Sequence, residues 1–384
     1  MKNIVICFDG TWNTVDAQFP TNVIKAAQLV SPADARGVVQ AVCYDEGVGS
    51  MEVAFGNSIN RLLSGAFGFG LMDNIERAYR YLIFNYAPGD RIYLFGFSRG
   101  AFSARSFAGM LRACGILRKD RLHLFGKTIE TYQSRNREAG PDAAELVQFR
   151  RENSIAVYTA EGNAAVDQHP LSIEYIGVWD TVGSLGIPGS SIFANRFNKR
   201  YQFHDLALSR MVKSARHALA IDERRSTFKP APWSNLDALN MAAGASHPAT
   251  PPYEQIWFPG DHSTVGGGTT FNGLWQAALI WVVEGASARG LAIDEALLER
   301  YRDGIDHTTS VDTAKGFSLA AIAPREWRDG PAGASLGEVA EVGQRRIKSP
   351  AEALFEKRLY RPRSLKAYLQ AFGETLGIST GNLV

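Results

Sequence analysis

The stretch LFGFSRGAFSAR, residues 94–105, places a serine between two glycines where two segments of different character meet. The residues before it, RIYLFGF (91–97), are apolar and aromatic, which is typical of a buried strand. The residues after it are small and helix-compatible. Gly96, Ser98 and Gly100 thus form a G-x-S-x-G turn between a strand and a helix, the context in which this pattern marks a nucleophile. We expect Ser98 to be an exposed nucleophile; the alternative is a glycine-rich turn that only packs closely.

Short β-branched runs alternate with longer helical patterns on both sides of this turn. The expected strands are residues 3–8, 38–44, 91–97, 173–179 and 253–259, and the expected helices are residues 21–30, 71–86, 102–117, 208–221 and 272–290. Strands that alternate with helices predict a parallel sheet joined by right-handed crossovers. The expected fold class is therefore α/β, with an open, mostly parallel sheet and helices on both faces.

Two stretches interrupt this alternation. Residues 118–170 are helical and charged without a clear strand, and residues 184–208 are rich in glycine, phenylalanine and asparagine. Both follow the carboxyl ends of strands, where open α/β sheets bind ligands, so we interpret both as cap insertions. The tail, about 325–384, is a polar extension that we expect to be helical from residue 349. We expect a single domain over residues 1–384.

A serine nucleophile needs a base, and the base needs an acid that orients it. Asp180 follows the expected strand 173–179 in GVWDTVGS, and His262 follows the expected strand 253–259 in IWFPGDHSTVGGG. Because the carboxyl ends of parallel strands share one edge of a sheet, we expect Ser98, Asp180 and His262 to meet there. Three other acids compete less well with Asp180: Asp222, Glu223 and Asp261. Among the other histidines we expect His217 to lie within a helix, as a packing residue or as a support for the site.

The developing oxyanion needs two N–H donors. The residue after the nucleophile, Arg99, is expected to give one amide, and Gly10 or Thr11 in the loop after the first strand is expected to give the other. Asp9 in this loop is unexpected, because a carboxylate repels an oxyanion. We expect it to hold the loop by a hydrogen bond to Thr11 or Asn13. The alternatives are that it orients Arg99 or holds a cation.

Composition excludes several other classes of protein. The 384 residues include 41 basic and 39 acidic residues, a net charge of +2 that gives no electrostatic case for binding nucleic acid. The first apolar run, Ile4–Phe8, is too short for the core of a signal peptide, and no apolar stretch reaches the ~18 residues of a membrane span. We therefore expect a cytoplasmic protein, with export by a route that needs no cleaved signal left open. We expect no metal and no cofactor, because the nucleotide and metal motifs are missing.

Seven motifs occur in an order that resembles one known family. They are CFDGTWN, YDEGVGS, GDRIYLFGFSRGAFSAR, GVWDTVGSLG, HALAIDERRSTFKP, WFPGDHSTVGGG and LYRPRSL. Together they resemble the catalytic domain of the type VI secretion phospholipase effectors of the Tle type, from Asp9 to about Pro362. The resemblance implies an α/β-hydrolase fold, the triad Ser98, Asp180 and His262, and cleavage of phospholipid acyl esters.

These observations predict a serine ester hydrolase that works through an acyl-enzyme. We expect a lipid or small ester as its substrate. Transient contact with a membrane and a secretion or immunity partner are left open. Two other hypotheses remain beside it: a non-catalytic binding or regulatory module on a hydrolase scaffold, and an acyltransferase in which an alcohol intercepts the acyl-enzyme.

Overall fold

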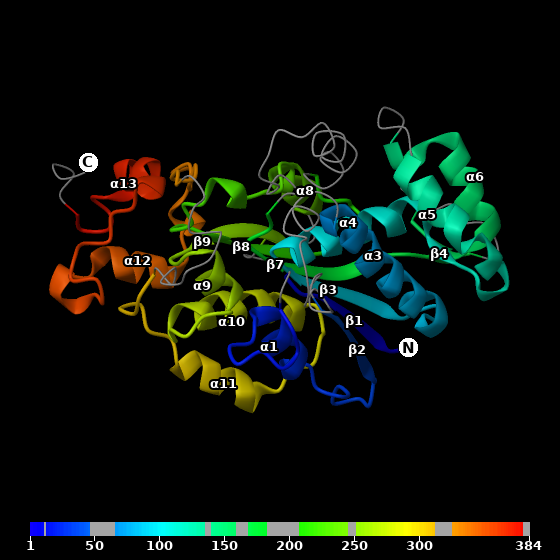
Figure 1. The fold of residues 1–384 in the computed structure, drawn as a ribbon, viewed down its shortest axis with the longest axis horizontal. Helices are drawn as coiled ribbons and strands as arrows, with labels where there is room; N and C mark the ends of the chain where they lie inside the picture. The colour runs from blue at the N-terminus through cyan, green and yellow to red at the C-terminus, as the bar shows by residue number, and fades with distance from the viewer. Residues whose placement is uncertain are drawn as a thin grey trace, which may run out of the picture.

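The computed structural model describes residues 1–10, 13–46, 66–134, 140–158, 168–182, 207–244, 251–311 and 325–378. Within these residues, six strands form the main sheet in the order β2-β1-β3-β7-β8-β9 (Figure 1). The strands are β1 (Asn3–Phe8), β2 (Gln40–Asp45), β3 (Arg91–Phe97), β7 (Ile173–Trp179), β8 (Ala215–Ala220) and β9 (Tyr253–Phe258). Each neighbouring pair is parallel. This confirms the predicted open parallel sheet of the α/β-hydrolase type.

Helices cover both faces of the sheet, and the first strand explains why. Along β1, Ile4, Ile6 and Phe8 pack into one apolar cluster, with side chains of α3 (Ala66–Asn85) and α4 (Arg99–Cys114). The alternate residues Val5 and Cys7 pack into a second cluster, with side chains of α1 (Asn22–Leu29) and α10 (Leu274–Ala288). A strand that is buried on both faces is a nearly continuous apolar run, which is the pattern of Ile4–Phe8.

The sequence prediction for residues 208–221 is wrong. The apolar residues there have helical spacing, but Ala215–Ala220 is the strand β8, which lies between β7 and β9. All but one of its residues are buried. A short run rich in alanine and leucine fits either a helix or a buried strand, and here the pairing with two neighbours decides. The strand brings His217 into the sheet.

The first expected cap, 118–170, is largely helical and lies at one end of the molecule, on the right in Figure 1. Its helices are η1 (Lys119–Leu124), α5 (Phe125–Ser134), η2 (Gly140–Asp142) and α6 (Ala144–Asn153). In contrast to the prediction, it also contains strands: β5 (Ser154–Val157) and β6 (His169–Pro170) pair with β4 (Ile116–Leu117) in a small second sheet. Of the second expected cap, 184–208, all but the last two residues lie outside the described ranges.

The remaining described elements are η4 (Ser226–Phe228), α8 (Leu236–Ala243), α9 (His262–Gly266), α11 (Glu295–Asp303), η6 (Leu336–Glu338), α12 (Glu341–Lys348), η7 (Ala351–Ala353), η8 (Arg363–Leu365) and α13 (Lys366–Phe372). Of these, α8, η6 and α12 contact the edge strand β9, whereas α11 packs on α10 and α1. The amide of Ala340 donates to the carbonyl of Trp257 (2.9 Å), so the C-terminal segment 325–378 is fastened to β9. Its first α-helix, α12, begins before residue 349, where we expected helical structure to start. In Figure 1 this segment lies at the opposite end from α5 and α6.

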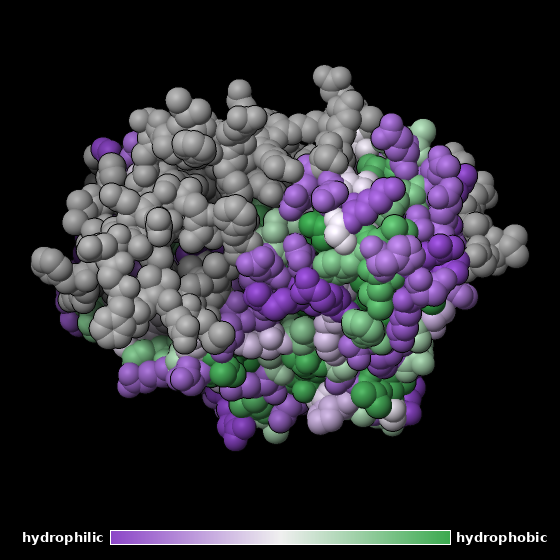
Figure 2. Space-filling view, turned by 45° about the vertical axis from the view of Figure 1, so that its right-hand side comes forward, coloured by the Kyte–Doolittle hydropathy of each residue, from purple (hydrophilic) through white to green (hydrophobic). Residues whose placement is uncertain are grey.

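The surface is mixed in polarity. Figure 2 shows hydrophilic and hydrophobic residues side by side over the described part of one face. Such mixing is ordinary for a protein surface, because polar atoms alone cannot cover a folded chain. Among the described residues, no helix combines the length and the apolar character needed to cross a membrane.

Candidate active site

Ser98 lies in a strained turn between β3 and α4. Its backbone has φ 58° and ψ −121°, a conformation that non-glycine residues rarely adopt and that is found at functional turns. The two flanking glycines are required by close packing. A Cβ at Gly100 would lie 2.2 Å from the carbonyl oxygen of Phe8, and one at Gly96 would lie 2.6 Å from that of Gly100. The geometry is therefore a sharp strand–turn–helix that holds Ser98 at the carboxyl edge of the sheet.

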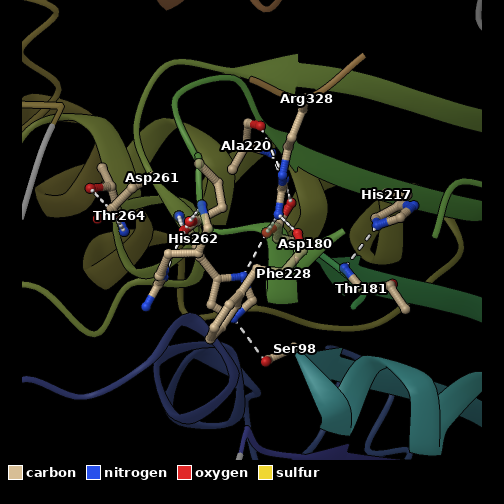
Figure 3. A network of polar contacts seen from close by, with 12 residues as sticks. Ser98, Asp180, Thr181, His217, Ala220, Phe228, Asp261, His262, Thr264 and Arg328 are labelled. Atoms are coloured by element: carbon tan, nitrogen blue, oxygen red, sulfur yellow. Dashed lines mark hydrogen bonds and ion pairs between the residues drawn. The ribbon is translucent and has the colours of Figure 1, made fainter. Parts of the chain in front are cut away.

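Three side chains form a continuous hydrogen-bonded chain at this edge (Figure 3). The His262 Nε2 lies 2.8 Å from the Ser98 Oγ, and the His262 Nδ1 lies 2.5 Å from the Asp180 Oδ2. Since a carboxylate only accepts, Nδ1 carries the proton and Nε2 is left to accept from the serine hydroxyl. The residues come from the ends of β3, β7 and β9. The structure thus brings together the three residues that the sequence analysis selected.

The imidazole of His262 contacts two aromatic rings. Phe97 lies 4.7 Å from it between ring centroids, and Phe228 lies 4.8 Å away with its ring edge-on. The Ser98 residue itself is only 7% exposed. Our expectation of an exposed serine is therefore wrong, because His262 and the backbone of Gly10 pack against it. A buried nucleophile and base are shielded from water, which strengthens every electrostatic interaction between them.

Asp180 is fully buried and accepts four hydrogen bonds. Its Oδ1 accepts from the Ala220 amide (3.0 Å) and from Arg328 Nη1 (2.6 Å). Its Oδ2 accepts from His262 Nδ1 (2.5 Å) and from Arg328 Nη2 (2.9 Å). Burial alone would raise the pKa of this carboxyl, but the charge of Arg328 and the hydrogen bonds from His262 and Arg328 hold its pKa well below its usual range. Asp180 is therefore a fixed carboxylate.

The competing acids have other partners. Asp261 caps α9 by accepting from the Thr264 amide (2.8 Å), and Asp222 accepts from the Gly260 amide (2.7 Å) and the Tyr360 hydroxyl (2.6 Å). Glu223 lies nearer the site, since its Oε2 accepts from the backbone amide of His262 (3.2 Å). Glu223 thus holds the main chain of His262, whereas the imidazole ring is hydrogen-bonded to Asp180.

His217 supports the turn that carries Asp180. From β8, its Nε2 accepts a hydrogen bond from the Thr181 amide (3.1 Å), the residue after the acid. Burial lowers the pKa of His217 to about 3, so its ring is neutral and can accept at this nitrogen. Asp180 itself has the left-handed φ of 38°, so a fixed partner on the next amide helps to hold that turn.

Two of the expected oxyanion donors, Arg99 and Gly10, lie next to Ser98. Arg99 is the first residue of α4, where backbone amides have no carbonyl partner within the helix. Gly10 approaches from the end of β1, and a Cβ on it would lie 3.3 Å from the Cβ of Ser98. Its amide donates to the Asp9 carboxylate (2.6 Å), so that amide is engaged in this structure. Thr11, the other candidate, lies outside the described residues.

Asp9 accepts hydrogen bonds from residues that we did not name as its partners; Thr11, one of the two that we named, lies outside the described residues. Besides the Gly10 amide, Asp9 accepts from the hydroxyls of Thr21 (2.7 Å) and Tyr44 (2.8 Å). Burial raises the pKa of Asp9, and these three hydrogen bonds oppose the shift. Asn13, one expected partner, donates instead to the carbonyl of Gly10 (3.0 Å). Among the described residues there is no cluster of side chains suited to hold a metal ion.

Comparison with known proteins assigns the chain to a family. Residues 2–285 match the catalytic domain of Tle1-like phospholipase effectors of type VI secretion, which is most of the chain. The chain belongs to this family. The matched region contains Ser98, Asp180 and His262.

The individual proteins that the chain resembles share 31% sequence identity with it or less. An uncharacterized protein of Saccharomyces cerevisiae, YEL023C, is 31% identical over 238 residues, which are 59% of this chain and 32% of the yeast protein. An uncharacterized protein from Pseudomonas aeruginosa has a TM-score of 0.44 at 17% identity, over 80% of this chain and 49% of that one. A Tle1 effector bound to the VgrG spike has a TM-score of 0.36 at 20% identity, over 70% of this chain and 51% of that one. The chain thus spans about a third to a half of the length of these proteins.

Arg328 lies beyond the matched region of the Tle1-like family, and the sequence analysis missed it. It stands 148 residues after Asp180, in the polar extension, and no motif marks it. An arginine that serves a distant carboxylate carries no local pattern, so only the folded structure identifies it. Arg225, which pairs with Glu223 (2.6 Å), was also missed, although it lies in the motif HALAIDERRSTFKP, two residues from its partner.

Proposed function

We propose that this chain is a serine hydrolase of carboxylic esters, acting on acyl esters of lipids or phospholipids. The observation that carries the proposal is the unbroken hydrogen-bonded chain from the Ser98 Oγ through His262 to Asp180. The backbone strain at Ser98 supports it, because such strain persists at functional sites. Membership of the Tle1-like phospholipase family supports the choice of a lipid ester.

In the first half of the reaction, the Ser98 Oγ attacks the ester carbonyl carbon while His262 Nε2 takes the hydroxyl proton. The amide of Arg99, with Gly10 or Thr11 as the second donor, receives the negative charge on the carbonyl oxygen. Asp180 stabilises the imidazolium and keeps its ring oriented. When the tetrahedral intermediate collapses, His262 gives its proton to the leaving alcohol, and the acyl group stays on Ser98.

The second half releases the acid by the same groups. His262 Nε2 takes a proton from a water molecule, whose oxygen attacks the acyl carbonyl. Collapse of the second intermediate breaks the bond to Ser98 Oγ, which regains the proton from His262. The products are a carboxylic acid and free enzyme. Because the amide of Gly10 is bonded to Asp9, it has to turn toward the substrate to serve as a donor.

The test is labelling with a fluorophosphonate, which reacts only with an activated serine. We expect wild type to be labelled, and Ser98→Ala and His262→Ala to be unlabelled. Ser103→Ala is the matched control, because Ser103 lies one turn further along α4 and bonds only to the Arg99 carbonyl among the contacts described (3.2 Å). Labelling of Ser98→Ala at the wild-type level would contradict the mechanism.

A substrate series then tests the ester class. We expect hydrolysis of p-nitrophenyl esters and phospholipids, with free fatty acid as the product. An alcohol acceptor added to the assay separates hydrolysis from acyl transfer, because transfer yields a new ester in place of the acid. A folded wild type that neither labels nor hydrolyses any ester would favour a binding module.

A further inference from the structure

The C-terminal segment reaches the triad through a short extended stretch, residues 325–328. It runs beside residues 224–228, with a bridge between Arg225 and Arg325 and a hydrogen bond from the Glu326 amide to the Arg224 carbonyl (2.6 Å). Successive side chains of an extended stretch point to opposite sides. Trp327 accordingly stacks on the guanidinium of Arg224 (5.2 Å), and Arg328 points inward to Asp180, as Figure 3 shows.

The guanidinium of Arg328 is held on more than one side. Its two terminal nitrogens each donate to one oxygen of Asp180, at 2.6 and 2.9 Å. They also donate to the carbonyls of Ala220 (3.1 Å) and Phe228 (2.5 Å). Its side chain is only 4% exposed. A planar fork fixed in this way sets the plane of the carboxylate, and hence the direction from which the carboxylate meets His262.

Other charged or titratable groups also face Asp180 and His262. Among the described residues they are Glu223 and Arg225, which pair with each other, the neutral His217, and Asp261, which caps α9. Arg328 differs from them because its charge is in direct hydrogen-bond contact with the carboxylate. The carboxylate that accepts from His262 Nδ1 is therefore already paired with the positive charge of Arg328.

We propose that Arg328 is a positioning residue of the triad, through which the C-terminal segment sets the orientation and the effective charge of Asp180. The inference rests on the proposed serine-hydrolase function. Arg328 does not contact the reacting atoms. It acts through Asp180 in two ways: the fork fixes the carboxylate plane, and the positive charge weakens the hold of the carboxylate on the imidazolium.

The two effects predict separable results. Without the positive charge of Arg328, the Asp180 carboxylate stabilises the imidazolium of His262 more strongly. We therefore expect the acid limb of the kcat/KM profile to lie at higher pH. Without the fork, the carboxylate is free to rotate and kcat falls. Arg328→Gln loses both, and we expect an acid limb about one pH unit higher with kcat lowered roughly 10- to 100-fold. Arg328→Lys keeps the charge, so it should keep the wild-type acid limb and lower only kcat.

The matched control is Arg346→Gln. Arg346 is a buried arginine of the same segment that also holds two carbonyls and a carboxylate: His307 (2.6 Å), Thr309 (2.6 Å) and Glu356 (2.6 Å). Within the described part of the chain, none of these hydrogen bonds reaches the triad. We expect Arg346→Gln to lower thermal stability and leave the pH profile and kcat per active site unchanged. Each variant is measured on the full chain, with active sites titrated by fluorophosphonate, so that misfolded protein does not count.

Three outcomes would contradict the proposed role of Arg328. A wild-type acid limb and kcat in titrated Arg328→Gln would overturn the proposal, as would the same shift in Arg346→Gln. Should Arg328→Gln fail to fold, Arg328→Lys decides, because a wild-type kcat in it contradicts a role for the fork. Labelling that persists in Ser98→Ala would instead refute the serine mechanism, so the two failures are distinguishable.

Discussion

The Gly100 Cα faces the carbonyl oxygen of Phe8 so closely that a Cβ there would lie 2.2 Å from it. This contact joins the start of α4 to the end of β1, the two places from which Ser98 and the Gly10 loop approach each other. Since the obstacle is backbone on both sides, neither can rotate away. The turn that presents Ser98 therefore requires a residue without a Cβ at position 100.

Gly100→Ala should therefore displace the turn. We expect the free energy of unfolding to fall by about 2–4 kcal/mol, and the rate of fluorophosphonate labelling to fall with it. Gly126→Ala is the control, since Gly126 is also helical and a Cβ on it meets nothing within 4 Å. That variant should be neutral or slightly stabilising, because alanine is the better helix former. Urea denaturation measures both, and equal effects would contradict the argument.

The Asp9 carboxylate should contribute to stability through its three donors. Asp9→Ala leaves the Gly10 amide and the hydroxyls of Thr21 and Tyr44 without their acceptor, and we expect a loss of roughly 2–4 kcal/mol. Tyr44→Phe removes one donor only and should cost about 1 kcal/mol. Urea denaturation of both variants checks the order. Full stability of Asp9→Ala would mean that the loop is held by other contacts.

Asp180→Asn should affect both activity and stability. An asparagine cannot favour the imidazole tautomer in which Nε2 accepts from Ser98, and kcat should fall by about four orders of magnitude. It also leaves Arg328 buried beside a neutral group, which should cost about 3–5 kcal/mol of stability. Ester hydrolysis and urea denaturation measure the two effects.

The double variant Asp180→Asn with Arg328→Met tests the ion pair. Removing the unpaired buried charge should restore part of the stability lost in the single variant, while the protein stays inactive. If the double variant is as unstable as the sum of both single variants, the two residues are not energetically coupled.

His217 should make the protein less stable in acid. Its pKa of about 3 in the folded chain lies below that of an unfolded histidine, so below pH ~6.5 the unfolded chain binds a proton that the folded chain does not. Stability is therefore present at pH 7 and lost as pH falls, by about 2 kcal/mol at pH 5. The difference in unfolding free energy between these two pH values should shrink in His217→Gln. His169→Gln, which changes an exposed histidine, should behave as wild type.

The local features of this protein could be predicted from its sequence. The G-x-S-x-G turn, the strands 3–8, 91–97 and 173–179, and the helix within residues 21–30 depend on turn chemistry and periodicity, which neighbouring residues carry. Asp180 and His262 could be placed because parallel strands end at one edge of the sheet. This rule needs only the order of strands along the chain.

Tertiary packing decided the rest. The apolar residues in 208–221 have helical spacing. Residues 215–220 are nevertheless a strand, because β7 pairs with them on one side and β9 on the other. Asp9 accepts from the hydroxyls of Thr21 and Tyr44, and Ser98 is buried, because segments that are distant in the sequence converge there. Arg328 pairs with a carboxylate 148 residues away. Such partners share no local pattern, because the free energy that joins them arises only when burial removes both from water.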